Sequence, residues 1–257
     1  MPLLATPSEV SRLLANLKNM SAEEMANTLA LLEEIDKRKR VLLAQNDFLA
    51  FIAAIDADYK FGTHLKRLGA LLMQIEEGLK DRIAVSMAPR FGKSQMISIY
   101  YPAWYLGRHP DHKMILASHT SDLAVDMARK VRNLMQSDDY KTIFPGVGLQ
   151  ADSKAAGRWA TNSGGDYFAI GVGGAVTGKG ADILIIDDPH SEQEAALSEV
   201  NPEIYDKTYE WYTSGPRQRL QPGGSIIIVM TRWSKKDLTG QVLRSAAQRE
   251  GEDWEVI

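Results

Sequence analysis

The sequence predicts an α/β fold with a mainly parallel central sheet flanked by helices, preceded by an N-terminal helical extension. At 257 residues the chain is long enough for one large domain. Short apolar runs without polar alternation, typical of strands buried on both faces, stand at 83–85, 114–117, 183–186 and 226–229. Between the second and third runs, apolar residues recur at helical spacing, at Leu123, Met127, Val131 and Leu134. Strand, helix and strand in this order predict parallel strands joined by right-handed crossovers.

Two capped helices are expected ahead of the sheet, in the segment up to about Gln45. Thr6 with Glu9, and Ser21 with Glu24, have the spacing of a capping box, in which each side chain satisfies the other's backbone. The second helix carries the basic run 37–40, which is typical of a solvated helix end, although a phosphate-contacting patch would have the same composition.

Composition excludes several classes of protein. The chain is 44% hydrophobic and 25% charged, which is ordinary for a soluble globular protein. It has no cysteine and five scattered histidines, so disulfides and thiolate metal sites are excluded and the remaining metal chemistry is oxygen-ligated. No stretch approaches the ~18 apolar residues of a membrane span, and no signal peptide is visible, so we expect no membrane association. The net charge of −3 means that nucleic-acid binding would need a local patch.

A phosphate-binding loop is predicted between the strand at 83–85 and a helix expected over 95–106. Gly92 lets backbone N–H groups approach phosphate, Lys93 reaches the β- and γ-phosphates, and Ser94 ligates Mg²⁺. Position 87 is Met where the pattern G-x-x-x-x-G-K-[ST] has glycine, and a bare G-K-S is frequent by chance. The strand before and the helix after favour nucleotide binding, with ATP and Mg²⁺ as cofactors. The residues expected to bind them are Pro89, Arg90, Phe91, Gly92, Lys93, Ser94 and Gln95.

Two carboxylates follow the apolar run 183–186, where α/β proteins bind their ligands. In an ATPase with this loop, Asp187 would hold Mg²⁺ and Asp188 would orient the attacking water. Asp188 is one methylene shorter than the glutamate of many ATPases, and Glu192 or Glu194 could take the role of base. The alternative is a strand that ends in an Asp-Asp-Pro turn.

A third element is the expected strand 225–230, which leads into Thr231, Arg232 and Trp233. A hydroxyl at the end of a strand beside the phosphate loop can sense the γ-phosphate, and Arg232 and Trp233 can transmit its loss. The alternative is that Trp233 is a core residue and Arg232 a surface ion-pair partner.

Together these motifs resemble the ATPase domain of the large terminase subunit of tailed bacteriophages, over residues 60–245. The matching segments are a deviant phosphate loop at 88–94, a downstream helix at 102–108, a glycine-rich loop with the Mg²⁺ strand at 168–189, and a coupling motif at 230–240. The resemblance does not extend over residues 1–57, where the capped helices predict an N-terminal helical region, and it implies a P-loop ATPase domain at 58–257. It also implies an ATP-hydrolysing motor that drives double-stranded DNA into a procapsid through sequence-independent contacts.

The resemblance further implies a homo-oligomeric ring at the procapsid portal, in the cytoplasm of the infected bacterial host, with the portal protein and the small terminase subunit as partners. A basic residue of the neighbouring subunit would complete each site. Lys179 is the first candidate and Arg158 the second, and the alternative is a loop lysine that faces water. The segment 61–64 lies where such proteins hold adenine. Relatives continue into a ribonuclease H-like nuclease, which we expect this chain to lack, so we predict no DNA cleavage.

Two other functions fit the same residues. One is a docking or assembly module for the small terminase or portal, switched by nucleotide without turnover. The other is a helicase-like DNA remodelling ATPase, which is disfavoured because no second motor half is visible. In the motor, Lys93, Asp188 and Thr231 would act on the γ-phosphate in cis together with Arg90.

Overall fold

The computed structural model describes residues 11, 20–153, 155–198, 200–201, 203–248 and 253–257. The helix expected from Thr6 lies outside the described residues. In the part of the chain that is described, no helix combines the length and apolarity that crossing a bilayer requires.

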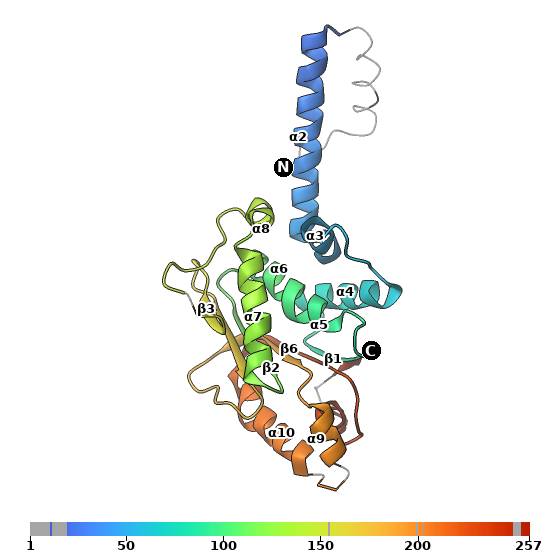
Figure 1. The fold of residues 1–257 in the computed structure, drawn as a ribbon, viewed down its shortest axis with the longest axis vertical. Helices are drawn as coiled ribbons and strands as arrows, with labels where there is room; N and C mark the ends of the chain where they lie inside the picture. The colour runs from blue at the N-terminus through green and yellow to red at the C-terminus, as the bar shows by residue number, and fades with distance from the viewer. Residues whose placement is uncertain (1–10, 12–19, 154, 199, 202, 249–252) are drawn as a thin grey trace.

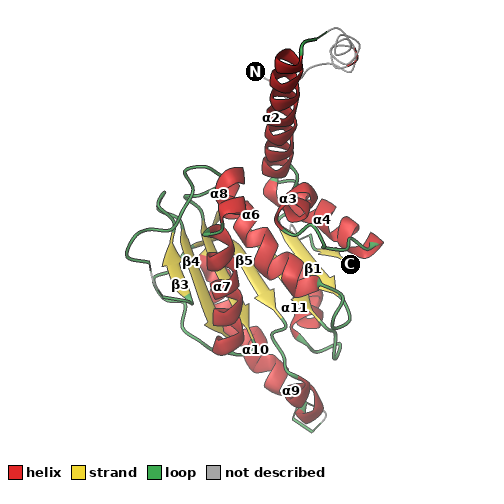
Figure 2. Cartoon of the chain, turned by 45° about the horizontal axis from the view of Figure 1, so that its top comes forward, coloured by secondary structure: helices red, strands yellow, loops and turns green. Residues whose placement is uncertain are grey.

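The fold is built on a seven-stranded sheet, counted over the described residues, with helices on both faces (Figure 2). The strand order is β3-β4-β2-β5-β6-β1-β7, and every pairing is parallel except that of β3 with β4. The strands are β1 (Arg82–Ser86), β2 (Lys113–Ser118), β3 (Arg158–Ala160), β4 (Asp166–Gly171), β5 (Ala181–Asp187), β6 (Leu220–Met230) and β7 (Glu255–Val256). The predicted fold class is confirmed.

Four strands coincide with the four predicted apolar runs, and three were not predicted. β1, β2, β5 and β6 form the buried centre of the sheet, where both faces are covered. β4 was missed because its burial alternates along the strand, whereas β3 and β7 are only a few residues long.

The helices lie before, between and after the strands. They are α2 (Ala22–Asn46), α3 (Phe48–Ile55), α4 (Thr63–Glu76), α5 (Lys93–Gln95), the π-helix η2 (Met96–Tyr100), α6 (Tyr101–Arg108), α7 (Ser121–Met135), α8 (Asp138–Ile143), α9 (Glu192–Leu197), α10 (Glu203–Ser214), the 3₁₀ turn η3 (Pro216–Arg219) and α11 (Leu238–Ala246). The helix expected over 95–106 therefore begins two residues earlier and includes a π-helical turn.

Helix α2 projects away from the sheet like an arm (Figure 1). It begins at the predicted capping box, in which the Ser21 hydroxyl accepts from Glu24 N and Glu24 accepts from Ser21 N. The basic run 37–40 lies inside this helix, whereas a helix end was expected. Arg38 and Arg40 pair with acidic residues one turn earlier, Glu34 and Asp36, on the exposed surface. These exposed pairs agree with a solvated face.

Two hydrophobic cores lie on the two faces of the sheet. Helices α3, α4, α6 and α7 cover one face, and α10 and α11 cover the other. Phe48, Phe51 and Ile52 are fully buried in the first core together with Ile183 and Ile185 of β5. Residues before position 58 therefore share a hydrophobic core with the sheet. The domain boundary after residue 57 stays a prediction.

The buried face of α7 is shifted by one position along the chain at three of the four predicted residues, and only Val131 is shared. Leu123 is 40% exposed, and the buried residues are Ala124, Ala128, Val131 and Met135. The small alanines allow the helix to approach the sheet closely, and the larger Val131 and Met135 are also fully buried in the same core.

Candidate nucleotide-binding site

The predicted phosphate loop and the two aspartates meet at the carboxyl edge of the sheet. In the strand register, Ser86 of β1 lies opposite Met230 of β6, and Asp187 of β5 lies opposite Val229. The segments that follow these three strands therefore leave the sheet side by side. This is the edge where ligands bind in open α/β sheets.

The loop between β1 and α5 uses left-handed backbone at two positions. Gly92 has φ +83°, a conformation that glycine adopts without steric cost, and α5 begins at the next residue. Arg90 has φ +67°, which is uncommon for a residue with a side chain. Met87 N donates to Met230 O at 3.3 Å, so the residue in place of the first glycine still follows the sheet.

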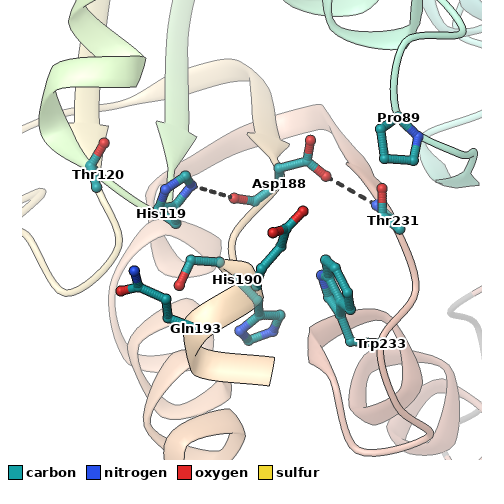
Figure 3. Close-up of a pocket in the computed structure, with 10 residues that line it drawn as sticks. Pro89, His119, Thr120, Asp188, His190, Gln193, Thr231 and Trp233 are labelled. Atoms are coloured by element: carbon teal, nitrogen blue, oxygen red, sulfur yellow. Dashed lines mark hydrogen bonds between the residues drawn. The ribbon is translucent and has the colours of Figure 1, made fainter. Parts of the chain in front are cut away.

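Lys93 is held under the loop and points at the second aspartate. Its side chain is 7% exposed, and its Nζ lies 2.5 Å from Asp188 Oδ2. Asp188 Oδ1 accepts from Thr231 N at 3.0 Å, and His119 N donates to the Asp188 carbonyl (Figure 3). Asp188 has φ +44°, so its backbone is also left-handed. Lys93, Asp188 and Thr231 thus form one connected group, and their roles toward a nucleotide stay predictions.

Asp187 is fully buried, and both of its carboxylate oxygens accept from serine hydroxyls. Ser94 Oγ lies 3.0 Å from Oδ1, and Ser98 Oγ lies 2.6 Å from Oδ2. Burial, together with the neighbouring Asp188 carboxylate, raises the pKa of Asp187 to about 6, although the two serines and Lys93 oppose the shift.

The oxygen donors beside Asp187 fit a magnesium ion. Proteins hold Mg²⁺ in phosphate sites through one or two oxygens of their own, together with substrate phosphates and water. A serine hydroxyl beside a buried carboxylate supplies that chemistry. Among the described residues, no three or more His, Cys, Asp or Glu side chains gather where they could hold a metal. Binding of Mg²⁺ would therefore depend on the Ser94 hydroxyl and on ligand phosphates.

Two pockets flank the phosphate loop. One, of about 560 Å³, opens beside Asp188 and is lined by Pro89, His119, Thr120, Asp188, His190, Ser191, Glu192, Gln193, Thr231 and Trp233 (Figure 3). The other, of about 460 Å³, is lined by Asp56, Asp58, Tyr59, Lys60, His64, Leu65, Arg90, Phe91, Gly92 and Gln95. In the second pocket the His64 ring meets Phe91 edge-on at 5.7 Å. The segment expected near adenine therefore lies beside the loop, and its role stays a prediction.

The candidate bases occupy different positions. Glu194 closes the capping box of α9, where its Oε2 accepts from Ser191 N at 2.8 Å. Glu192 lines the pocket beside Asp188, and Glu194 is not among the lining residues. Asp188 is therefore the carboxylate that the structure places against Lys93.

Lys179 lies away from the phosphate loop. It precedes β5, at the amino edge of the sheet, where its Nζ pairs with Asp166 of β4 and lies 5.3 Å from the Phe168 ring centroid. Arg158, the second candidate, is exposed on β3. Neither residue joins the site within this chain, and a role toward a neighbouring subunit stays a prediction.

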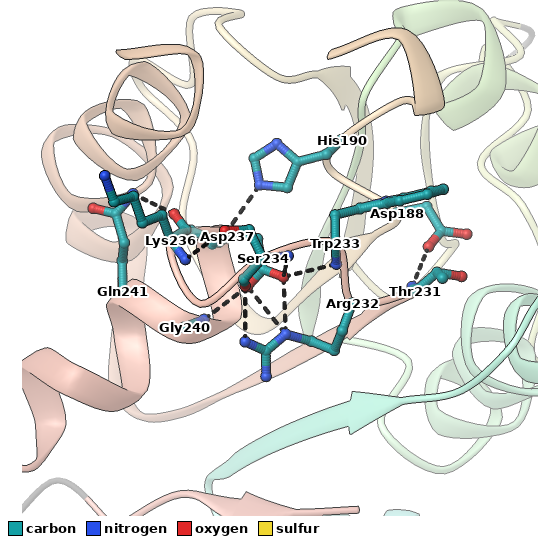
Figure 4. A network of polar contacts seen from close by, with 11 residues as sticks. Asp188, His190, Thr231, Arg232, Trp233, Ser234, Lys236, Asp237, Gly240 and Gln241 are labelled. Carbon is teal, nitrogen blue, oxygen red and sulfur yellow. Dashed lines mark hydrogen bonds and ion pairs between the residues drawn. The ribbon is translucent and has the colours of Figure 1, made fainter. Parts of the chain in front are cut away.

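The segment after β6 is organised by a buried carboxylate. Asp237 accepts from Arg232 Nε at 2.9 Å, from Trp233 N and Ser234 N at 3.1 Å, and from Gly240 N at 2.9 Å (Figure 4). The view of Arg232 as an ion-pair partner is confirmed. Trp233 is 39% exposed and lines a pocket, so the alternative that placed it in the core is wrong.

His190 joins the loop after Asp188 to the same helix. Its Nε2 accepts from Leu238 N at 3.0 Å, at the start of α11, and its ring meets Tyr205 of α10 edge-on. Neither His119 nor His190 was singled out from the sequence, because a histidine outside a motif carries no signal of its contacts. Ser98 was also missed, although its spacing of four from Ser94 indicates a shared helix face.

The fold defines an α/β protein with a mostly parallel sheet flanked by helices, and the candidate site lies in a strand-loop-helix unit at the carboxyl edge of that sheet. Among solved structures, the chain is similar to the crystal structure of the HK97 bacteriophage large terminase, with 12% sequence identity and a TM-score of 0.49. The match covers 77% of this chain and 39% of that one, so the matched part spans about two-fifths of that protein. A likeness of this degree concerns the fold alone. No protein-family model matches the chain, and no curated protein matches its sequence.

Proposed function

We propose that this chain is a Mg²⁺-dependent ATPase and the motor domain of a viral large terminase that moves double-stranded DNA into a procapsid. One observation carries the ATPase proposal. Lys93 and Ser94 of the phosphate loop are in hydrogen-bond contact with Asp188 and Asp187, respectively, at the carboxyl edge of the sheet. A cation, a hydroxyl and two carboxylates in this order are what phosphoryl transfer needs for positioning and charge neutralisation.

Each residue has a role that follows from its position. The backbone N–H groups at Gly92 and the start of α5 would cradle phosphate, and Lys93 would neutralise the β- and γ-phosphate oxygens. Ser94 and Asp187 would hold Mg²⁺, which when bound neutralises the charge that develops on the phosphates. Asp188 would orient the attacking water and accept its proton.

Thr231 and Arg90 would act from the two sides of the loop. The Thr231 N–H is already bonded to Asp188, so a shift of that carboxylate would be felt at the start of the segment 231–237. Arg90 is exposed beside the pocket that contains His64 and Phe91, and it would contribute positive charge toward bound phosphates.

The motor assignment rests on the resemblance of four ordered sequence motifs to the terminase ATPase domain. From it we further propose sequence-independent contacts to double-stranded DNA, a homo-oligomeric ring, and docking to the portal protein and the small terminase subunit in the host cytoplasm. DNA contacts of this kind would weaken steeply with salt, because they depend on phosphate neutralisation.

A second candidate is a docking module that nucleotide switches without turnover. The observation that favours it is the α2 arm, on which Leu29, Leu31, Leu42 and Leu43 are exposed. Exposed apolar residues on a projecting helix suit a protein partner. Such a module would bind ATP and release no phosphate.

Phosphate release from ATP, measured with and without Mg²⁺, tests the proposed function. The wild-type chain should hydrolyse ATP only with Mg²⁺, and Lys93→Ala should lose at least ~10²-fold in rate while its circular dichroism is unchanged. Lys80→Ala is a matched control. Lys80 also pairs with a carboxylate, that of Glu255 at 3.2 Å, but it lies just before β1 and outside the phosphate loop. Near wild-type hydrolysis by folded Lys93→Ala would remove the phosphate-loop assignment.

A further inference from the structure

The helix after the phosphate loop carries a second hydroxyl on the same buried carboxylate. Ser98 has no exposed surface, and its Oγ donates to Asp187 Oδ2 at 2.6 Å. Ser94, one turn earlier, donates to the other oxygen, Oδ1, at 3.0 Å. The shorter of the two hydrogen bonds thus belongs to the residue that is not part of the phosphate-loop motif.

A π-helical turn surrounds Ser98. The turn spans Met96–Tyr100, and Tyr101 N donates to the Met96 carbonyl five residues back. Residues four apart lie on the same helix face, so Ser94 and Ser98 both face β5. Such π-turns inside longer helices are rare overall. Those that do occur are often found at functional sites.

Packing does not explain a serine at this position. Its neighbours Met96 and Ile97 are fully buried and apolar, and an apolar side chain at position 98 would suit these surroundings without any need for a polar partner. A buried hydroxyl is costly unless it is hydrogen-bonded, and so is a buried carboxylate oxygen. The contact between Ser98 and Asp187 satisfies both groups at once.

We infer that Ser98 is a positioning residue for Mg²⁺: it fixes Asp187 through Oδ2 and leaves Oδ1 and the Ser94 hydroxyl as the pair available to the ion. The inference rests on the proposed function, because it takes Asp187 and Ser94 as the metal-holding residues. Hydrogen bonds that orient a metal-holding carboxylate are typically worth ~10–100-fold in metal affinity or activity.

Ser118 provides a matched control. It is also a buried serine, and in the strand register it lies directly opposite Asp187, on β2. Its Oγ has no hydrogen-bond partner among the described residues. Ser118→Ala therefore removes a hydroxyl at the same depth, beside the same residue, without removing a contact to the carboxylate.

The test is the affinity of the full chain for a fluorescent ATP analogue, measured by titration in EDTA and again in Mg²⁺. For the wild type, Mg²⁺ should strengthen binding. In Ser98→Ala this gain should shrink about 10-fold or more, with the affinity in EDTA unchanged within about twofold. Ser118→Ala should match the wild type in both conditions, and Ser98→Thr, which keeps the hydroxyl, should restore the gain.

Contrary outcomes separate the two proposals. If the wild type gains affinity with Mg²⁺ and folded Ser98→Ala gains equally, Ser98 has no positioning role and the proposed function stands. The inference is likewise overturned if Ser118→Ala loses as much of the Mg²⁺-dependent gain in affinity as Ser98→Ala does. If Ser98→Ala does not fold, failure of folded Ser98→Thr to keep the Mg²⁺-dependent gain overturns it. If the wild type binds no nucleotide in either condition, both proposals fall.

Discussion

Lys93 Nζ lies 2.5 Å from Asp188 Oδ2, so the residue expected to meet phosphate is paired with the residue expected to orient water. The lysine is almost fully buried, and the aspartate is about one-third exposed toward the pocket that contains Thr231 and Trp233. Under the proposed function, nucleotide phosphates and the Asp188 carboxylate would compete for one cation. We therefore expect ATP binding to separate this pair before hydrolysis.

Asp188→Asn is expected to preserve nucleotide binding and to reduce turnover by ~10²–10⁴-fold, because the amide cannot accept a proton from water. Binding of a fluorescent ATP analogue and phosphate release, measured on the same preparation, separate the two effects. The affinity for the analogue should equal that of the wild type or exceed it, because the variant lacks the negative charge that competes with the phosphates for Lys93.

Glu194→Gln is the matched test of the alternative base. Glutamine still accepts at the capping box of α9, so the helix start is retained and hydrolysis should stay near the wild-type rate. Loss of turnover in Glu194→Gln, together with normal turnover in Asp188→Asn, would transfer the role of base to Glu194. Glu192→Gln, which changes the glutamate that lines the pocket, completes the series.

Asp237→Ala is expected to lower the free energy of unfolding by ~2–5 kcal/mol, since it leaves Arg232 and three backbone N–H groups without their buried acceptor. Urea unfolding followed by circular dichroism measures the loss. Asp126→Ala is the control, because its pairs with Arg129 and Lys130 are exposed and should be worth less than about 1 kcal/mol. Equal effects of the two variants would refute the role given to Asp237.

His190 should make the folded chain sensitive to acid. Burial, together with His119, lowers the pKa of His190 to about 4, although the charges of Glu194 and Asp237 oppose the shift. The unfolded state then takes up a proton below its ordinary pKa of about 6.5 while the folded state does not, so stability falls as the pH falls from about 6.5 to 4. The loss should reach up to about 3 kcal/mol.

His190→Gln should remove this part of the acid sensitivity, because glutamine can still accept from Leu238 N but does not titrate in this range. Urea unfolding at a series of pH values between 4 and 7 measures both proteins. Parallel stability curves for the wild type and His190→Gln would show that the histidine is not held neutral by the fold.

Turnover per chain should rise with protein concentration if a basic residue of one subunit completes the site of the next, since such a charge contributes ~10³–10⁵ in rate. Lys179→Ala and Lys93→Ala lack different halves of a shared site, so a mixture should regain activity that neither has alone. If Lys179→Ala is fully active and mixing restores nothing, its pairing with Asp166 is its whole role, and Arg158 becomes the next candidate.

The buried strands and the residues that follow them were predictable because their signals are local. Ile183–Ile186 is apolar on both faces of the sheet, and Lys93 and Asp187 stand at fixed places relative to strands, so their meeting at one edge follows from parallel pairing. The edge strand β3 gave no such signal, because three residues with one buried side chain form no recognisable pattern.

Contacts between distant segments could not be read from the sequence. The pairing of Lys93 with Asp188 depends on side-chain length and on two left-handed residues, Arg90 and Asp188, whose backbone no propensity predicts. The contact of Lys179 with Asp166 depends on the unpredicted strand β4. Ser98 was hidden because a serine within an apolar helix is informative only once its carboxylate partner is known.

A crystal structure of the full chain with a non-hydrolysable ATP analogue and Mg²⁺ tests the proposed site most directly. We expect the phosphates to lie against the N–H groups that follow Gly92, with Lys93 Nζ moved from Asp188 to the phosphate oxygens and the ion beside Ser94 and Asp187. A triphosphate bound elsewhere, or one bound while Lys93 stays on Asp188, would contradict the proposed site.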